Sequence, residues 1–374
     1  MITIEKIIFP NKIKEFIDFP HDLYKNDTLY VPELFLAQKD LLNPKKHPFF
    51  EHSKLDLFLA YKDQKLVGRI AAIRNNNHIA FTGKQEGFFG FFECVENYEV
   101  AKKLFDAATD WIRQENLTTV VGPTNFSTNE PFGMLIDGFD TPPMLSTTYN
   151  KQYYDSFCIK YGFVKKVDFY AYLIKSINVS EKAVKLSDAL EARLKTKSII
   201  VRPISMKNYD KESENASAVY NAAWDKNLGF VPMTHNEFMH LCKEMKMIVD
   251  PDLCLVAEHE GKMVGFAFAL PNINQLLINI KRGRLFPFGI FKLLFQRKKI
   301  NTLRIVVLGV IEGYRKLGIE AVFYSKIITS GKAKKIVMGE ASLILETNDM
   351  MNQGLRNINA EIYKTSRLYE MPVK

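Results

Sequence analysis

Apolar and polar residues alternate in two long stretches of the chain, residues 56–73 and 252–269. Each stretch has two alternating runs joined by a short polar turn, which is the pattern of an antiparallel β-hairpin. Both carry Asp-Leu-x-Leu in the first run and Lys-(Leu/Met)-Val-Gly after the turn. The pattern therefore predicts the same hairpin twice, with the second copy starting 196 positions (252 − 56) after the first.

The similarity between the two halves extends beyond the hairpins. In each half an apolar strand and an amphipathic helix are expected after the hairpin, and an aromatic strand is expected at the end. The strands and helices are Gly87–Glu93 with Tyr98–Ile112 and Arg304–Val310 with Ile319–Ser330, and the final strands are Gly162–Tyr172 and Ala360–Glu370. The hairpin glycines are 197 positions apart (265 − 68) and the final strands 198 (360 − 162). Landmarks at nearly one spacing indicate that a whole domain was duplicated.

These elements predict an α/β fold with two tandem domains, each a mixed, strongly twisted sheet flanked by helices. We place the first domain at residues 1–175, a charged helical connector at 176–198 and the second domain at 199–374. The length of 374 residues fits two domains better than one. Within the first domain, the segment from Pro20 to Phe50 is expected to be a loop.

The stretch that carries the chemistry begins with the β-branched strand Arg304–Val310. It continues into the loop Ile311–Glu320, which has two glycines and the adjacent cations Arg315 and Lys316, and then into a helix. The first N–H groups of a helix have no partner inside it, and the helix dipole adds partial positive charge there. Glycine lets the backbone approach phosphate oxygens closely. This arrangement is typical of a pyrophosphate-binding site.

The second half resembles the acyl-CoA-binding half of the GNAT superfamily of N-acyltransferases. The resemblance rests on the order strand, Arg-x-x-Gly-x-(Gly/Ala) loop, helix, strand, Glu-x-Asn, helix and aromatic strand. The loop fits at Arg315 and Gly318 and departs at Glu320, where the family has Gly or Ala. The first half has Cys94–Val100 at the corresponding place, with two carboxylates and no glycine. The first half therefore reads as a GNAT-like domain with a degenerate cofactor loop.

The resemblance implies a set of cofactor-binding residues in the second half. These are Leu308, Val310, Arg315, Lys316, Gly318, Ile319 and Asn348. A backbone N–H between Leu308 and Val310 would polarise the thioester carbonyl. Asn348 would either bond the pantetheine amides or cap the next helix.

The resemblance also implies residues that move protons. The first candidate for the general base is Glu346, and Glu340 and Glu312 follow. The tyrosine that usually acts as the acid is absent, because the two halves have Arg356 and Cys158 at its place. Tyr363 or Tyr369 could substitute for it. No metal is implied.

The expected function is acyl transfer from acetyl-CoA or a longer acyl-CoA to an amine acceptor. Two other classes stay open at this stage. The absent tyrosine and Glu320 suit a catalytically inactive tandem GNAT-fold binding protein. The basic surface suits a transferase of the same fold that uses aminoacyl-tRNA. Binding of CoA would separate the first class from the other two.

The segment 281–299 is a basic and aromatic insertion between the second hairpin and the strand Arg304–Val310, and no acidic residue occurs from 261 to 311. One interpretation is a packed helix with solvated cationic ends. A second is peripheral contact with an anionic membrane, so that a lipid-like amine would be the acceptor. The acyl path would then be lined by apolar side chains of the insertion, Leu285, Phe286, Phe288, Phe291 and Phe295. Nucleic-acid binding ranks last, because aromatic residues spaced for a helix face stack poorly on bases.

Composition, net charge and cysteine content indicate the kind of protein and its compartment. The chain is 47% hydrophobic and 25% charged, which is typical of a globular protein, and its formal net charge of +9 favours an anionic partner. Four scattered cysteines (Cys94, Cys158, Cys242 and Cys254) with apolar neighbours are expected to be reduced and buried. The first residues lack the pattern of a signal peptide. We therefore expect a cytoplasmic protein, with attachment to the inner face of the membrane as the accompanying hypothesis.

Overall fold

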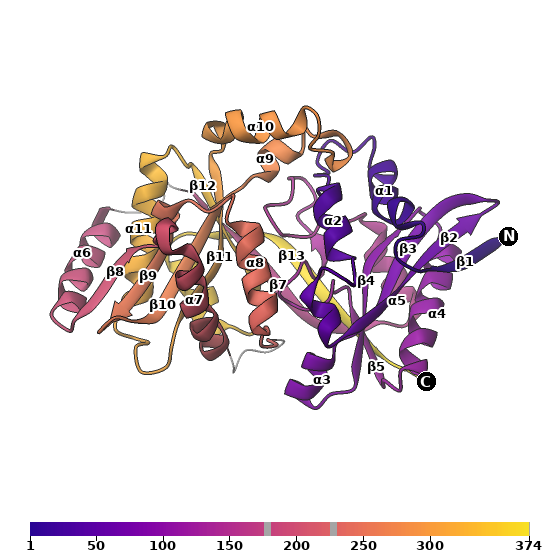
Figure 1. The fold of residues 1–374 in the computed structure, drawn as a ribbon, viewed down its shortest axis with the longest axis horizontal. Coiled ribbons are helices and arrows are strands. Elements are labelled where there is room, and N and C mark those ends of the chain that lie inside the picture. The colour runs from indigo at the N-terminus through magenta and orange to yellow at the C-terminus, as the bar shows by residue number, and fades with distance from the viewer. Residues whose placement is uncertain (176–180, 225–229, 374) are drawn as a thin grey trace. The chain divides into compact units, whose positions relative to one another are not determined.

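The computed structural model describes residues 1–175, 181–224 and 230–373. The chain divides into two compact units. The first unit contains Met1–Tyr170, Asn274–Phe295 and Lys364–Lys374, and the second contains Ala171–Ile273 and Gln296–Tyr363. Both units are α/β structures in which helices cover a mixed sheet (Figure 1).

The first unit is built on a sheet with the strand order β1-β2-β3-β4-β5-β13-β7, and β6 also pairs with β13. Among the pairings described in it, β4 with β5 is parallel and the others are antiparallel. Two apolar cores lie on the two faces of the sheet. One is formed with α4 and α5, and the other with α1. The elements are β1 (Ile2–Ile7), α1 (Ile13–Leu23), α2 (Phe35–Leu41), η1 (Pro48–Glu51), β2 (Lys54–Lys62), β3 (Lys65–Arg74), α3 (Asn76–Thr82), β4 (Glu86–Cys94), α4 (Tyr98–Gln114), β5 (Thr119–Gly122), β6 (Met134–Asp137), α5 (Tyr153–Tyr161), β7 (Val164–Lys175), α9 (Asn274–Leu277), η5 (Lys281–Gly283), α10 (Gly289–Gln296) and β13 (Glu361–Pro372).

The second unit repeats this plan with the order β7-β12-β11-β10-β9-β8. Its one parallel pair is β11 with β12, among the pairings described, and it occupies the place of β4 with β5. The elements are α6 (Glu181–Lys195), β8 (Ile199–Pro203), η3 (Met206–Asn208), α7 (Tyr209–Trp224), α8 (His235–Met245), η4 (Pro251–Leu253), β9 (Cys254–His259), β10 (Lys262–Pro271), η6 (Arg297–Lys299), β11 (Thr302–Val310), α11 (Ile319–Ala333), β12 (Met338–Leu345) and α12 (Asp349–Asn357).

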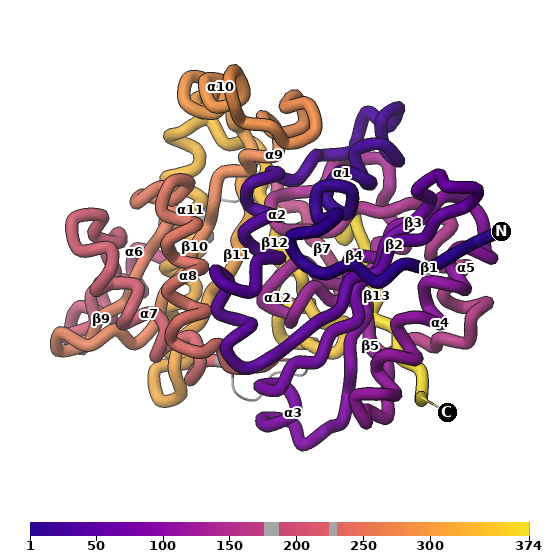
Figure 2. Tube along the Cα trace, turned by 45° about the vertical axis from the view of Figure 1, so that its right-hand side comes forward, coloured from indigo at the N-terminus to yellow at the C-terminus, as the bar shows by residue number. Residues whose placement is uncertain are grey.

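The last strand of each half extends beyond its own half. The C-terminal part of β13 pairs antiparallel with β5, with Tyr369 opposite Gly122 and Pro372 opposite Thr119. Figure 2 shows this yellow strand next to the purple strands of the first unit. The end of β7, from Ala171, belongs in turn to the second unit and neighbours β12. The domain boundary predicted at 175/199 does not capture this exchange, because strand pairing between distant segments leaves no local pattern in a sequence.

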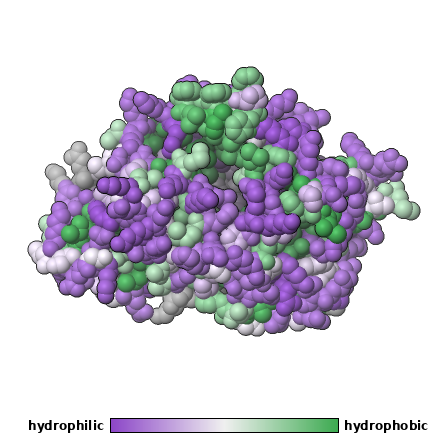
Figure 3. All heavy atoms as spheres, in the orientation of Figure 1, coloured by the Kyte–Doolittle hydropathy of each residue, from purple (hydrophilic) through white to green (hydrophobic). Residues whose placement is uncertain are grey.

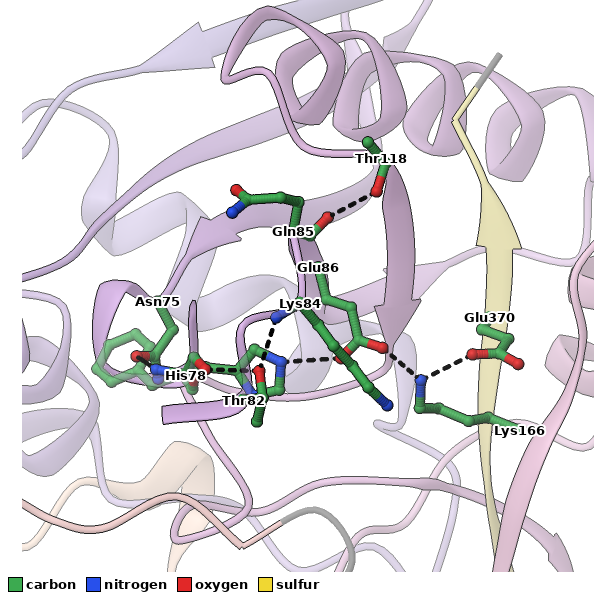
Figure 4. A network of polar contacts seen from close by, with 10 residues as sticks. Asn75, His78, Thr82, Lys84, Gln85, Glu86, Thr118, Lys166 and Glu370 are labelled. Carbon is green, nitrogen blue, oxygen red and sulfur yellow. Dashed lines mark hydrogen bonds and ion pairs between the residues drawn. The ribbon is translucent and has the colours of Figure 1, made fainter. Parts of the chain in front are cut away.

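A polar network ties the exchanged strand β13 to β7 and β4 inside the first unit (Figure 4). Lys166 Nζ contacts Glu86 and Glu370, each at 2.7 Å, and His78 Nε2 lies 2.8 Å from Glu86. Burial opposes ionisation of Glu86, but the bonds from His78 and Lys166 outweigh it and lower the pKa of Glu86 to about 2. Glu86 is therefore a carboxylate at neutral pH, and the network fixes three strands together.

Most of the predicted elements are confirmed, including both hairpins and the two strand–helix pairs that follow them. The predicted loop from Pro20 to Phe50 is wrong in part, because it contains α2 and η1. The connector helix is present as α6, and residues 176–180 of the predicted connector lie outside the described residues. All four cysteines are buried and free, as expected.

Candidate active site

The parallel strands β11 and β12 of the second unit separate part of the way along their length. They are paired from Thr302 with Met338 to Ile305 with Ala341. Beyond that pair β11 continues to Val310 and β12 to Leu345, and no further pairing between them occurs in the described residues. On its other side β11 stays paired with β10, with an extra residue, Val306, between the partners of Phe268 and Ala269. A bulge of this kind bends a strand away from its neighbour.

The free edge of β11 presents backbone N–H groups. The Ile311 N–H donates to the Val264 oxygen of β10 at 3.0 Å. Successive peptide groups of a strand alternate between its two edges, so the N–H groups of Val310 and Leu308 point away from β10, toward β12. These are the two residues for which an oxyanion-binding role was predicted. Their N–H groups can pair with an extended ligand that carries amide and carbonyl groups.

The loop between β11 and α11 has three residues with left-handed backbone, Gly313 (φ 91°), Lys316 (φ 66°) and Gly318 (φ 96°). Gly318 is the N-cap of α11, and the first N–H groups of this helix have no intrahelical partner. Arg315 is held against the loop backbone, because its Nε donates to the Val310 oxygen at 3.0 Å and a terminal nitrogen donates to the Ala223 oxygen at 2.9 Å. Arg315 therefore shapes the loop, and both it and the adjacent Lys316 are exposed cations.

Two features limit the space and the favourable charge for an anion at the N-terminus of α11. A Cβ on Gly318 would lie 3.1 Å from the Leu190 side chain of α6. Glu320 lies in the first turn of α11 and is half-buried. Together with burial, its charge raises the pKa of Tyr324 to about 12. A carboxylate at this place suits the helix dipole when the site is empty and repels an anionic ligand.

A buried polar cluster lies where β11 and β12 separate. Arg304 faces Glu340 directly across the parallel pair, with Nε 3.5 Å from the carboxylate, and it also donates to Ser342 Oγ at 3.0 Å. Ser342 and Tyr363 both donate hydrogen bonds to Glu340. Glu340 is fully buried, whereas Tyr363 keeps some exposure. Burial, and next the charge of Glu340, raise the pKa of Tyr363, so its hydroxyl stays protonated.

The other predicted residues of the second unit lie at the end of β12. Glu346 is half-buried in the turn that follows the strand, and its backbone oxygen accepts from Asn352 Nδ2 at 3.2 Å. Asn348 is the N-cap of α12 and accepts from the Met351 N–H at 3.2 Å, which is the capping alternative given for it. Glu312 is exposed in the loop between β11 and α11.

Tyr369 lies in a different environment from Tyr363. It is buried in the core of the first unit with α4 and α5, and its hydroxyl donates to Asp155. Burial and this carboxylate raise its pKa. Of the two tyrosines proposed as substitute acids, Tyr363 lies beside the separating strands of the second unit.

In the first unit, the edge of β4 that corresponds to the free edge of β11 is covered. Cys94 in β4 is opposite the hairpin glycine Gly68, as Val310 in β11 is opposite Gly265. The Cys94 N–H donates to the Tyr154 hydroxyl at 2.8 Å, and its carbonyl accepts from Tyr153 at 2.8 Å.

The β5–β6 loop covers the remainder of the edge of β4. The Phe91 N–H donates to Asn125 Oδ1 at 2.8 Å, and the Thr124 N–H donates to the Phe89 oxygen at 2.8 Å. A Cβ on Gly90 would lie 2.4 Å from the Thr124 oxygen, so the loop fits closely against the strand. The protein's own side chains and loop thus occupy, in the first unit, the edge that is open in the second.

The basic and aromatic insertion 281–299 is folded as η5, α10 and η6. Four of the five residues predicted to line an acyl path, Phe286, Phe288, Phe291 and Phe295, have exposed side chains. No helix within residues 1–175, 181–224 and 230–373 is long and apolar enough to cross a membrane. In the same residues, no three His, Cys, Asp or Glu side chains are grouped to hold a metal ion.

Comparison with known proteins gives relatives along the whole chain. Protein YghO of Escherichia coli (strain K12) is 33% identical over 97% of this chain and 93% of its own length. A bacterial ceramide synthase of Caulobacter vibrioides is 32% identical over 99% of this chain and 97% of its own length. No family model matches. Among solved structures, a tandem GNAT protein from the clavulanic acid biosynthesis pathway aligns with a TM-score of 0.60 over 100% of this chain and 99% of that one, at 9% identity. The tandem GNAT fold predicted from the sequence is confirmed.

Proposed function

Because this chain belongs to the family that includes Protein YghO and a bacterial ceramide synthase, and has the tandem GNAT fold, we propose that it is an acyl-CoA-dependent N-acyltransferase. The observation that carries the proposal is the separation of β11 and β12 after Ile305 and Ala341, next to the glycine loop that starts α11. We assign the donor site to the second unit, because the corresponding edge of the first unit is occupied by its own tyrosines and loop.

The donor would bind along the cofactor loop and the free edge of β11. The pyrophosphate would lie against the N–H groups at Gly318 and Ile319, with Lys316 as a cation nearby in the loop. The amide groups of the pantetheine arm would pair with the N–H and carbonyl groups of the β11 edge. A thioester carbonyl placed at Val310 or Leu308 would receive a backbone hydrogen bond that strengthens as negative charge develops on its oxygen.

Two proton transfers accompany the reaction. The amine nitrogen attacks the thioester carbonyl carbon, the C–S bond breaks and an amide forms. The proton leaving the amine would pass to Glu346, which is partly exposed at the end of β12. The departing thiolate would receive a proton from Tyr363, whose hydroxyl is held by Glu340. Glu340 itself is fully buried and bonded by Ser342 and Tyr363, so we assign it to positioning rather than to substrate contact.

A long-chain amine is the acceptor class that the comparisons favour. The Caulobacter relative is named a ceramide synthase, and a ceramide is the amide of a long-chain amino alcohol with a fatty acid. We extend that acceptor class to this chain. A long acyl-CoA such as palmitoyl-CoA would then be the donor, in preference to acetyl-CoA.

The test is an activity assay with the purified chain, palmitoyl-CoA and sphinganine in mixed micelles. Release of free CoA thiol and appearance of the N-acyl product by mass spectrometry are both expected, and acetyl-CoA should give at least about tenfold less product. Thiol release without amide would indicate hydrolysis and contradict the acceptor assignment. Absence of both, together with acyl transfer from a charged tRNA in the same buffer, would favour the aminoacyl-tRNA-dependent alternative.

A further inference from the structure

A cluster of large apolar side chains is exposed on α10 and the loop before it. Phe286, Phe288, Phe291, Leu294 and Phe295 are between 54% and 78% exposed. In the space-filling view they give a green area over α10 at the top of the molecule (Figure 3). Scattered single apolar residues are ordinary on protein surfaces, but a contiguous cluster of this size marks an interaction site.

The helix α10 has two different faces. Gly289 is buried, and Ile290 and Leu293 are partly buried, so this face packs on the protein. The opposite face carries Phe291 and Phe295, whose rings are parallel (5° between planes) with centroids 6.3 Å apart. The outward face is therefore an apolar ridge that runs along the helix.

The segment before α10 is fixed to α1 by ion pairs. Arg282 contacts Asp22 at 2.5 Å, and one terminal nitrogen of Arg284 lies 2.9 Å from both carboxylate oxygens of Asp18. Asp18 is buried. Arg282 and Arg284 belong to the segment for which membrane contact was one interpretation, but their charges are neutralised here and hold the segment in place. These ion pairs therefore fix the segment that leads into the apolar ridge.

The remaining cations of the segment are close to the ridge along the chain. Lys281, Lys292, Arg297, Lys298 and Lys299 are exposed, and none of them is paired with a carboxylate among the described residues. Lys292 and Arg297 donate to the backbone oxygens of Asn279 and Met247 instead. An apolar ridge next to uncompensated positive charge matches the interfacial region of a bilayer with anionic headgroups.

We infer that residues 281–299 form a docking surface for an anionic lipid bilayer, with the phenylalanines inserted among the acyl chains and the exposed cations at the headgroups. A second copy of this chain fits less well, because a symmetric contact would bring two sets of the same five cations together. The binding itself is independent of catalysis. Its link to the acceptor rests on the proposed function, because a long-chain amine resides in the membrane that this surface would contact.

The experiment is co-sedimentation of the full chain with vesicles, in the absence of any substrate. Vesicles of mixed phosphatidylglycerol and phosphatidylcholine are compared with phosphatidylcholine alone, at low and high salt. Binding to the anionic vesicles is expected, with weakening as salt rises. The triple variant Phe288→Ser/Phe291→Ser/Phe295→Ser should lower the partition coefficient at least about tenfold, and Lys298→Glu/Lys299→Glu should lower it on anionic vesicles alone.

A matched control removes an exposed apolar side chain elsewhere. Ile159 on α5 is 56% exposed, and Ile159→Ser should leave vesicle binding unchanged. Thermal melts confirm that the variants are folded, and Phe291→Trp should show a blue-shifted emission with anionic vesicles. Wild-type binding equal to that of the triple variant, or no binding to anionic vesicles, would overturn the inference. So would sedimentation velocity that shows a dimer of the wild type and a monomer of the triple variant, because the ridge would then contact a second copy.

Discussion

Arg304 and Glu340 lie directly opposite each other on β11 and β12, one residue before these parallel strands separate. Both side chains are buried, and the pair is joined by Ser342 and Tyr363. Burial lowers the pKa of Arg304, while the charge of Glu340 opposes that shift. The cluster therefore lies at the end of the paired part of the two strands, next to the proposed acyl-CoA site.

Glu340 and Glu346 should differ in what their substitution changes. Glu340→Gln leaves the Arg304 charge buried without its partner, and the free energy of unfolding should fall by about 3–5 kcal/mol. Glu346→Gln removes the proposed base from a partly exposed turn, so kcat should fall about 100-fold with little change in Tm. Denaturant unfolding and steady-state kinetics on both variants check this, with Glu214→Gln at an exposed position of α7 as the control. Unchanged kcat in Glu346→Gln would rule out that base.

Glu320 should weaken donor binding. It stands in the first turn of α11, where the proposed pyrophosphate would lie. Glu320→Ala removes a like charge, and the affinity for CoA should rise about two- to fivefold at low salt, which corresponds to the 0.3–1 kcal/mol of charges at a helix terminus. Lys316→Ala should have the opposite effect. Calorimetry at two ionic strengths measures both, and equal affinities in Glu320→Ala and wild type would mean that this carboxylate points away from the ligand.

The sequence predicted the local elements well and the long-range arrangement poorly. The alternation of apolar and polar residues predicted both hairpins, and the internal repeat predicted the duplicated fold, because both patterns recur regularly along the chain. The exchange of β7 and β13 was missed, since the pairing of Tyr369 with Gly122 depends on residues far apart in the sequence.

The candidate site was predicted in the same uneven way. The glycines of the loop between β11 and α11 indicated a backbone that can approach phosphate oxygens closely, and Gly318 has φ 96°. The role of Arg304 was not predicted, because a lone arginine in an apolar strand does not reveal that Glu340 lies opposite it. Nor did the sequence show that Tyr154 and Asn125 close the equivalent edge in the first unit, as these are side-chain contacts between distant segments.

The stability of the protein should depend on pH through Glu93. This carboxyl is buried at the end of β4 and accepts hydrogen bonds from Tyr24 (2.9 Å) and Tyr154 (2.7 Å). Burial raises the pKa of Glu93 to about 7, in spite of Arg69 and the two tyrosines. A raised folded-state pKa means that stability is full below the unfolded value and is lost as pH rises to about 7.

The loss from this group should be on the order of 3 kcal/mol between pH 4.5 and pH 7. Glu93→Gln should remove that part of the pH dependence, because the amide does not ionise. Urea unfolding of both proteins at several pH values measures it. Parallel pH profiles for Glu93→Gln and wild type would contradict the assignment.

Lys166 should matter more for stability than its neighbour Lys165. Lys166 joins Glu86 on β4 to Glu370 on the exchanged strand β13, whereas Lys165 makes a more exposed pair with Asp168. Lys166→Met should lower the free energy of unfolding by about 1–3 kcal/mol, since it leaves two carboxylates near each other without the cation. Lys165→Met should cost less than about 1 kcal/mol. Equal losses in the two variants would show that the network does not fix β13.

The proposed donor site is tested most directly by calorimetric titration of palmitoyl-CoA into the wild type and into Gly318→Trp. The substitution places a large side chain against Leu190 at the start of α11, and Gly354→Trp, at an exposed position with open space around it, is the control. We predict one binding site per chain, lost in Gly318→Trp and kept in Gly354→Trp, with both variants folded by thermal melt. Binding that survives in Gly318→Trp, or no binding to the wild type, would contradict a donor site between β11 and α11.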